Sequence, residues 1–112
     1  MITGEVIQRE AIVAIEVWSS GPTPNRLDAV IDTGYNGYLT LSAALVATLG
    51  LAFAGNRSGT LADGSTVVLD VFLGIVSWHG QRREVLIAQA QGIPLIGMSL
   101  LDGSRLTIDV VD

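Results

Sequence analysis

Turn-forming residues recur about every ten positions along this chain, and the segments between them are short and rich in β-branched residues. An amphipathic helix needs a longer run in which apolar residues recur three and four positions apart. Most of the chain is interrupted too often to supply such runs, so its apolar segments are best buried as short strands joined by tight turns. We therefore predict an all-β domain.

The same turn-forming residues predict where the individual strands and turns lie. Two prolines in the segment 21–25 remove backbone donors and disfavour helix, which predicts a loop there. The pair Asp63-Gly64 is a strong signal for a hairpin between two strands. A second hairpin turn is expected over residues 78–81. The expected strands cover residues 12–18, 26–31, 71–77, 83–89 and the tail 105–111.

Two short helices are expected within this β framework. Ser42 is a suitable N-cap for a helix over residues 43–49, which are mostly helix formers. Gly50 then stands where a left-handed residue commonly ends a helix. A second helical turn over residues 98–101 is stopped by the turn at 102–103.

Length and charge restrict the possible partners. A chain of 112 residues fits a single domain spanning residues 1–112. The net charge of -5 argues against a nucleic-acid partner, because binding phosphate backbones requires clustered Lys and Arg. Charged residues make up 15% of the chain and hydrophobic residues 49%, so one small domain cannot hide all of its apolar surface. This balance favours self-association.

The sequence lacks the usual signals for a metal centre or a membrane. It has no cysteine and a single histidine, His79, so no metal site and no cofactor is expected. Its most apolar run, residues 43–55, is much shorter than the roughly 20 residues needed to cross a bilayer. The first residues do not resemble a signal peptide. We therefore expect no membrane partner and a cytoplasmic location.

The most informative segment is an apolar strand that ends in Asp32-Thr33-Gly34. Such a strand delivers a carboxylate from a rigid element to a sharp turn, where Gly34 can take backbone angles closed to other residues. Thr33 can bond to neighbouring backbone or to its counterpart across a symmetry axis. Asp and Gly are also ordinary turn residues, so the tripeptide alone favours a plain turn.

A second motif, Leu95-Ile96-Gly97, opens the expected helical turn near the end of the chain. With both motifs in this order, the sequence resembles the retropepsin-like aspartic peptidases of viruses and bacteria. The sequence Leu-Ile-Gly-Met-Ser-Leu-Leu of residues 95–101 is most similar to the corresponding segment of the bacterial members. The resemblance extends from about residue 12 to residue 110.

The resemblance implies a retropepsin-like closed β-barrel or sandwich with a flap hairpin, acting as a two-fold homodimer. It implies that Asp32 is catalytic, that Thr33 and Gly34 support its turn, and that the protein hydrolyses peptide bonds. The residues expected to contact a peptide or protein substrate are Tyr35, Ala62, Asp63 and Gly64. Those expected to pack behind the catalytic turn are Leu95, Ile96 and Gly97.

The chemistry of an aspartic peptidase explains why a single Asp-Thr-Gly in the chain points to a dimer. Activating a water and protonating a leaving group requires a base and an acid. Two carboxylates about 3 Å apart cannot both ionise, so they share a proton and fill both roles. Because one chain of this length supplies one such turn, the second Asp32 must come from a second subunit.

Some positions depart from the viral pattern. Tyr35 replaces the usual alanine or serine, and its ring is expected to narrow the substrate groove beside the catalytic pair. Met98 and Asn36 occupy the places of an Arg–Asp ion pair, so both partners of that bridge are missing together. The flap sequence 62–65 also lacks a glycine-rich tip.

Two alternatives to an aspartic endopeptidase remain open at this stage. The first is a catalytically weak or inactive module that keeps the retropepsin-like body for binding or dimerisation. The second is a small β-barrel whose Asp-Thr-Gly is a coincidental turn. A structure with Asp32 far from any subunit axis would support the second alternative.

Overall fold

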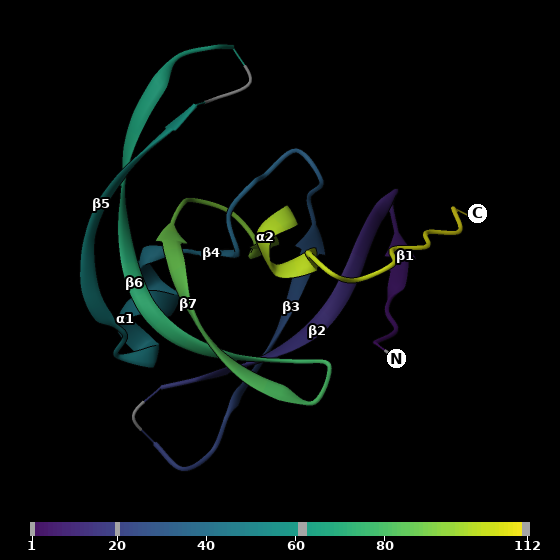
Figure 1. Ribbon diagram of the computed structural model, residues 1–112, viewed down its shortest axis with the longest axis horizontal. Helices are drawn as coiled ribbons and strands as arrows, with labels where there is room; N and C mark the ends of the chain where they lie inside the picture. Colours follow the sequence, from purple (N-terminus) through teal and green to yellow (C-terminus); the bar gives the residue numbers. More distant parts are fainter. Residues whose placement is uncertain (1, 20, 61–62, 111–112) are drawn as a thin grey trace.

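The computed structural model describes residues 2–19, 21–60 and 63–110, and it confirms the all-β architecture (Figure 1). Four of the expected strands lie within β2, β3, β6 and β7. The strands are β1 (Glu5–Ile7), β2 (Glu10–Trp18), β3 (Asn25–Ile31), β4 (Leu39–Leu41), β5 (Ala52–Thr60), β6 (Thr66–Trp78), β7 (Gln81–Gln89) and β8 (Leu95–Ile96). The helices are α1 (Ala43–Leu49) and α2 (Met98–Leu101).

The sheet closes on itself. Its strand order is β1-β2-β3-β8-β4-β7-β6-β5, and an additional antiparallel pairing of β2 with β6 turns the strands between them into a closed barrel. At this seam the indole N–H of Trp18 donates to the Ser77 hydroxyl at 2.9 Å. The guanidinium of Arg82 stacks on the Trp18 ring at 3.6 Å from its centre, which adds a cation–π contact. The expected closed barrel is therefore confirmed.

Two short strands that periodicity could not identify, β4 and β8, contribute fully buried residues to the barrel interior. Leu39 of β4 pairs with Ile87 of β7 on one side and with Ile96 of β8 on the other. All three side chains have no exposed surface. Burying each aliphatic side chain contributes about 1.5–3 kcal/mol, so this row is a major part of the core. Leu100 of α2 is equally buried and closes one end.

Three connections depend on residues with left-handed backbone angles. The β6–β7 turn places His79 and Gly80 at φ 51° and 75°, as a two-residue hairpin turn requires. The β5–β6 hairpin has Gly64 at φ 86°, so both hairpins predicted from the sequence are present. A third, unpredicted hairpin joins β1 to β2 through Gln8 and Arg9 at φ 50° and 66°.

The expected helices also form. In α1 the Ser42 hydroxyl accepts from the Leu45 N–H at 3.3 Å, and Gly50 ends the helix at φ 65°. α2 covers residues 98–101 as expected. Within the described ranges, neither helix is both long and apolar enough to cross a bilayer.

The prediction of a strand over the tail 105–111 is wrong for the residues that the structure describes. Residues 105–110 form no strand, and Val111 lies outside the described residues. The physical reason is that a strand needs a neighbouring backbone with which to bond, and the tail pairs with no strand of this single chain. Its apolar side chains are consequently exposed: Leu106 by 39%, Ile108 by 42% and Val110 by 61%.

Candidate active site

Asp32 stands immediately beyond the carboxyl end of β3, at the point where β3 meets β8. The two strands run parallel, with Val30 opposite Leu95 and Ile31 opposite Ile96. The Asp32 N–H continues this ladder by donating to the Ile96 carbonyl at 2.9 Å. The expectation that Leu95 and Ile96 pack behind the catalytic turn therefore has a specific geometry, in which they pair edge to edge with the strand that carries Asp32.

The turn fixes the Asp32 carboxylate through its own backbone. The Gly34 N–H donates to Oδ1 of Asp32 at 2.9 Å, and the Tyr35 N–H donates to the Asp32 carbonyl at 3.1 Å. Asp32 is half-buried, whereas Thr33 and Gly34 are exposed. A rigid strand followed by a hydrogen-bonded turn holds one carboxylate at the molecular surface, open to whatever approaches the turn.

The segment after the turn is bonded to the start of α2 at four successive carbonyl groups. The Tyr35 carbonyl accepts from the Met98 N–H at 2.7 Å, and the Tyr38 carbonyl accepts from the Gly97 N–H at 3.0 Å. Between them, the Asn36 carbonyl accepts from the Ser99 hydroxyl and the Gly37 carbonyl from the Ser99 N–H. Gly97 thus belongs to a backbone clamp as well as to the core.

This clamp stands where the viral pattern has an ion pair. Met98 contributes only its backbone N–H, and its side chain is 44% exposed. Asn36 contributes its carbonyl, and Ser99 supplies the donor. Ser99 is a site residue that the sequence analysis missed, because a serine inside a short helix gives no signal that its hydroxyl bonds to a loop.

The Tyr35 ring lies over two glycines, Gly37 and Gly97. A Cβ at Gly37 would fall on the hydroxyl and Cζ of Tyr35, and a Cβ at Gly97 would lie 2.5 Å from its Cδ2. Burial of the ring raises the pKa of the Tyr35 hydroxyl above its usual value. The ring is therefore packed against the backbone of the clamp.

The β5–β6 hairpin carries the other residues expected to contact substrate. Figure 1 shows this hairpin extending beyond the rest of the barrel. Among the described residues, the Asp63 carboxylate is bonded to Ser65 and the Asp32 carboxylate to Gly34, with no hydrogen bond between the two turns. Ala62 lies outside the described residues. At the tip, Oδ1 of Asp63 accepts from the hydroxyl of Ser65 at 2.6 Å and from its N–H at 2.9 Å.

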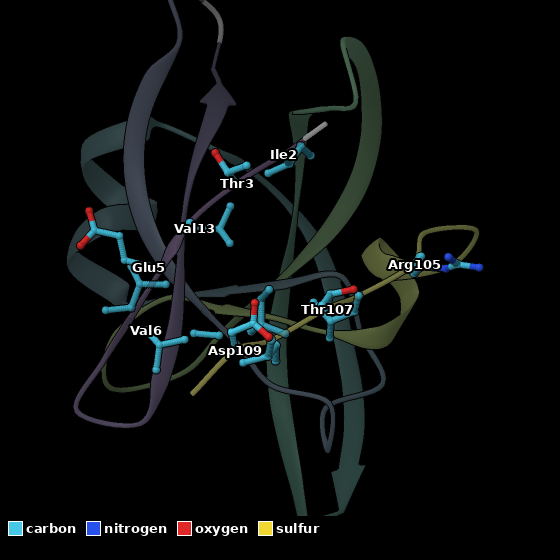
Figure 2. Close-up of a pocket in the computed structure, with 14 residues that line it drawn as sticks. Ile2, Thr3, Glu5, Val6, Val13, Arg105, Thr107 and Asp109 are labelled. Carbon is cyan, nitrogen blue, oxygen red and sulfur yellow. The ribbon is translucent and has the colours of Figure 1, made fainter. Parts of the chain in front are cut away.

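A hollow of about 510 Å³ lies on another part of the surface, between the N-terminal strand and the C-terminal tail (Figure 2). Its lining combines apolar and polar residues of β1, β2 and the tail, and Ile31, the neighbour of Asp32 in sequence, also reaches it. The described residues contain no group of three or more His, Asp or Glu side chains that could hold a metal ion.

Comparison with known proteins identifies the fold. A solved structure of EIAV protease complexed with the inhibitor HBY-793 matches 95% of this chain and 100% of its own, with a TM-score of 0.64 and 18% sequence identity. No protein-family model matches the sequence, and no curated protein matches it either. The chain therefore has a retropepsin-like fold, as the sequence motifs predicted.

The hairpin tip makes a testable prediction about pH. Two hydrogen bonds from Ser65, first from its hydroxyl and then from its N–H, lower the pKa of Asp63 below its usual value. The tip is consequently stabilised above the usual pKa, and this contribution is lost as the pH falls through the lowered value.

We expect Ser65→Ala to raise the pKa of Asp63 part of the way back, because only the hydroxyl contribution is removed. Carboxyl chemical shifts followed by NMR during an acid titration measure this change. Ser58→Ala, an exposed change in the same hairpin, is the matched control and leaves the Asp63 titration in place. An unchanged pKa in Ser65→Ala would contradict the assignment.

Proposed function

We propose that this chain is one subunit of a homodimeric aspartic endopeptidase, in which the Asp32 carboxylates of two subunits activate a water between them. The observation that carries the proposal is the placement of Asp32. It stands at the end of a barrel strand in a retropepsin-like fold, with its carboxylate held by the Gly34 N–H.

The chemistry requires the two carboxylates to differ in protonation. A pair about 3 Å apart shares one proton, because the charged forms repel each other. The ionised member takes a proton from water as the water attacks the peptide carbonyl. The protonated member donates to the substrate, and the proton gained from water later reaches the departing amine.

The terminal segments support dimerisation. Leu106, Ile108 and Val110 alternate along the tail and are exposed, as is Ile7 of β1 by 48%. Leu106 and Ile108 line the hollow between the tail and the N-terminal strand, where Figure 2 shows Val6 and Val13 on one side and Thr107 on the other. Extended backbone from a second subunit would bury this surface and give the tail the pairing partner that a single chain lacks.

The groove is proposed to take an extended peptide. Ile93, 53% exposed, and the half-buried Leu95 present apolar surface close to the catalytic turn, since the Val30 N–H donates to the intervening Pro94 carbonyl. The β5–β6 hairpin has exposed backbone suited to strand-like hydrogen bonds. Backbone bonding with apolar side-chain pockets would favour a peptide substrate with apolar residues at the cleavage site.

The alternative is a retropepsin-like module that binds or dimerises without turnover. The short hairpin tip, with Asp63-Gly64-Ser65 in place of a glycine-rich sequence, favours it. The two functions differ in what they require of Asp32. Turnover needs its ionisable carboxyl group, whereas a binding module needs only the intact turn.

We therefore expect Asp32→Asn to lower peptide cleavage by about a thousandfold or more while leaving the fold intact, because an amide cannot act as the shared acid and base. The measurement is cleavage of a diverse peptide mixture from acidic to neutral pH, read by mass spectrometry. Asp28→Asn, a change elsewhere on β3, is the matched control. Equal cleavage by wild type and Asp32→Asn would contradict the catalytic assignment.

Dimerisation is tested separately. Sedimentation at micromolar concentration is expected to show a dimer, and Ile108→Asp should weaken it by at least about tenfold because it places a charge in the proposed apolar interface. Val68→Asp introduces the same charge on the β5–β6 hairpin, at a side chain that is 68% exposed, and should leave the dimer unchanged. A wild type that stays monomeric would count against a shared catalytic pair.

A further inference from the structure

We propose that Tyr35 is a positioning residue for Asp32, and that its ring, seated on Gly37 and Gly97, locks the catalytic turn onto α2. This inference rests on the proposed function. It also changes the role expected for Tyr35, from narrowing the substrate groove to supporting the turn from within the chain.

The backbone provides the first argument. Tyr35 is the joint between the turn and the clamp: its N–H donates to the Asp32 carbonyl at 3.1 Å, and its carbonyl accepts from the Met98 N–H at 2.7 Å. A shift of the Tyr35 backbone therefore disturbs both its hydrogen bond to Asp32 and its hydrogen bond to Met98. The Gly34 N–H, which donates to Oδ1 of Asp32, belongs to the peptide group next to that of Tyr35. A shift of Tyr35 therefore also moves the donor that holds the carboxylate.

The fit of the ring provides the second argument. The three atoms nearest to a Cβ built on Gly37 all belong to Tyr35, namely its hydroxyl, Cζ and Cε1. Gly97 comes from the far end of the chain, yet Cδ2 of the same ring is among the closest atoms to its Cβ position. Neither glycine has a left-handed φ, so the backbone conformation does not demand glycine at these positions. At Gly37 the space for the Tyr35 ring demands it, whereas at Gly97 a Cβ would meet both the ring and the carbonyl oxygens of Gly37 and Tyr35.

The location of the ring explains what it would do. It lies against the backbone whose carbonyl groups accept hydrogen bonds from Met98 and Ser99. A half-buried aromatic ring at this place keeps water from competing for those bonds, and the bonds are stronger where water is excluded. Small displacements of a catalytic group are costly, since a misplacement of about 1 Å can lower a rate by about a hundredfold.

Combining substitutions at Gly37 and Tyr35 tests the packing of the ring on Gly37 by stability alone, without any assay of activity. Gly37→Ala should lower the midpoint of thermal unfolding by about 5–15 °C, because its Cβ overlaps the ring. In the Tyr35→Ala background, Gly37→Ala should lower the midpoint of thermal unfolding only slightly, since the ring atoms that its Cβ would overlap are absent. Gly97→Ala is the matched control and should be harmful in both backgrounds, because its Cβ would also meet the carbonyl groups of Gly37 and Tyr35. An equal drop in the unfolding midpoint on Gly37→Ala in both backgrounds would overturn the proposed packing of the Tyr35 ring on Gly37.

The link to Asp32 needs its own measurement. In the wild type, the NMR shift of the Gly34 amide proton should follow the titration of Asp32, because this N–H donates to the carboxylate. Tyr35→Ala should reduce that response, and Tyr35→Phe, which keeps the ring, should retain it. A full response in folded Tyr35→Ala would overturn the positioning role, and this result can be read even if no variant cleaves peptides.

Kinetics separate positioning from substrate contact once cleavage is established. Tyr35→Ala should lower kcat by about tenfold to a hundredfold, with a change in KM of less than about threefold, and Tyr35→Phe should restore most of kcat. A raised KM or an altered cleavage preference with unchanged kcat would show that the ring contacts substrate, and would overturn the proposal. Absence of cleavage by the wild type would instead reject the proposed function and leave the amide measurement as the test.

Discussion

The parallel pairing of β3 with β8 is the contact on which the rest of the site depends. It joins the strand that carries Asp32 to a segment near the other end of the chain, and the Asp32 N–H extends it by bonding to the Ile96 carbonyl. β8 contains only Leu95 and Ile96, so it is not stable as an isolated strand. It is held because Ile96 is completely buried and because β4 pairs with its other edge.

Two sets of hydrogen bonds connect this contact to the turn that carries Asp32. One set joins the last residues of β3 to β8. The other is the clamp, in which residues 35–38 accept hydrogen bonds from residues 97–99 at the start of α2. The hydrogen bonds of this clamp join neutral groups.

Much of this arrangement could be predicted from sequence, because the relevant signals are local. Asp63-Gly64 marks one hairpin, Ser42 and Gly50 bound α1, and the apolar strand before Asp32 predicts that this carboxylate lies in a turn at the end of a strand. The features that escaped prediction depend on distant partners or weak signals. β4 and β8 are too short to show periodicity, and Gln8 and Arg9 are unusual turn residues. The Ser99 bond to Asn36 and the contact of the Tyr35 ring with Gly97 join residues more than half the chain apart. The tail was expected to be a strand because its side chains alternate, but alternation cannot supply a pairing partner.

The central claim is that one active site contains Asp32 from two subunits. Mixing wild type with Asp32→Asn at constant total concentration, and allowing the subunits to exchange, tests this directly. If both carboxylates are required, only dimers of two wild-type subunits cleave, and activity falls as the square of the wild-type fraction. Activity that falls in direct proportion to the wild-type fraction would mean that each subunit acts alone, and would contradict the shared site.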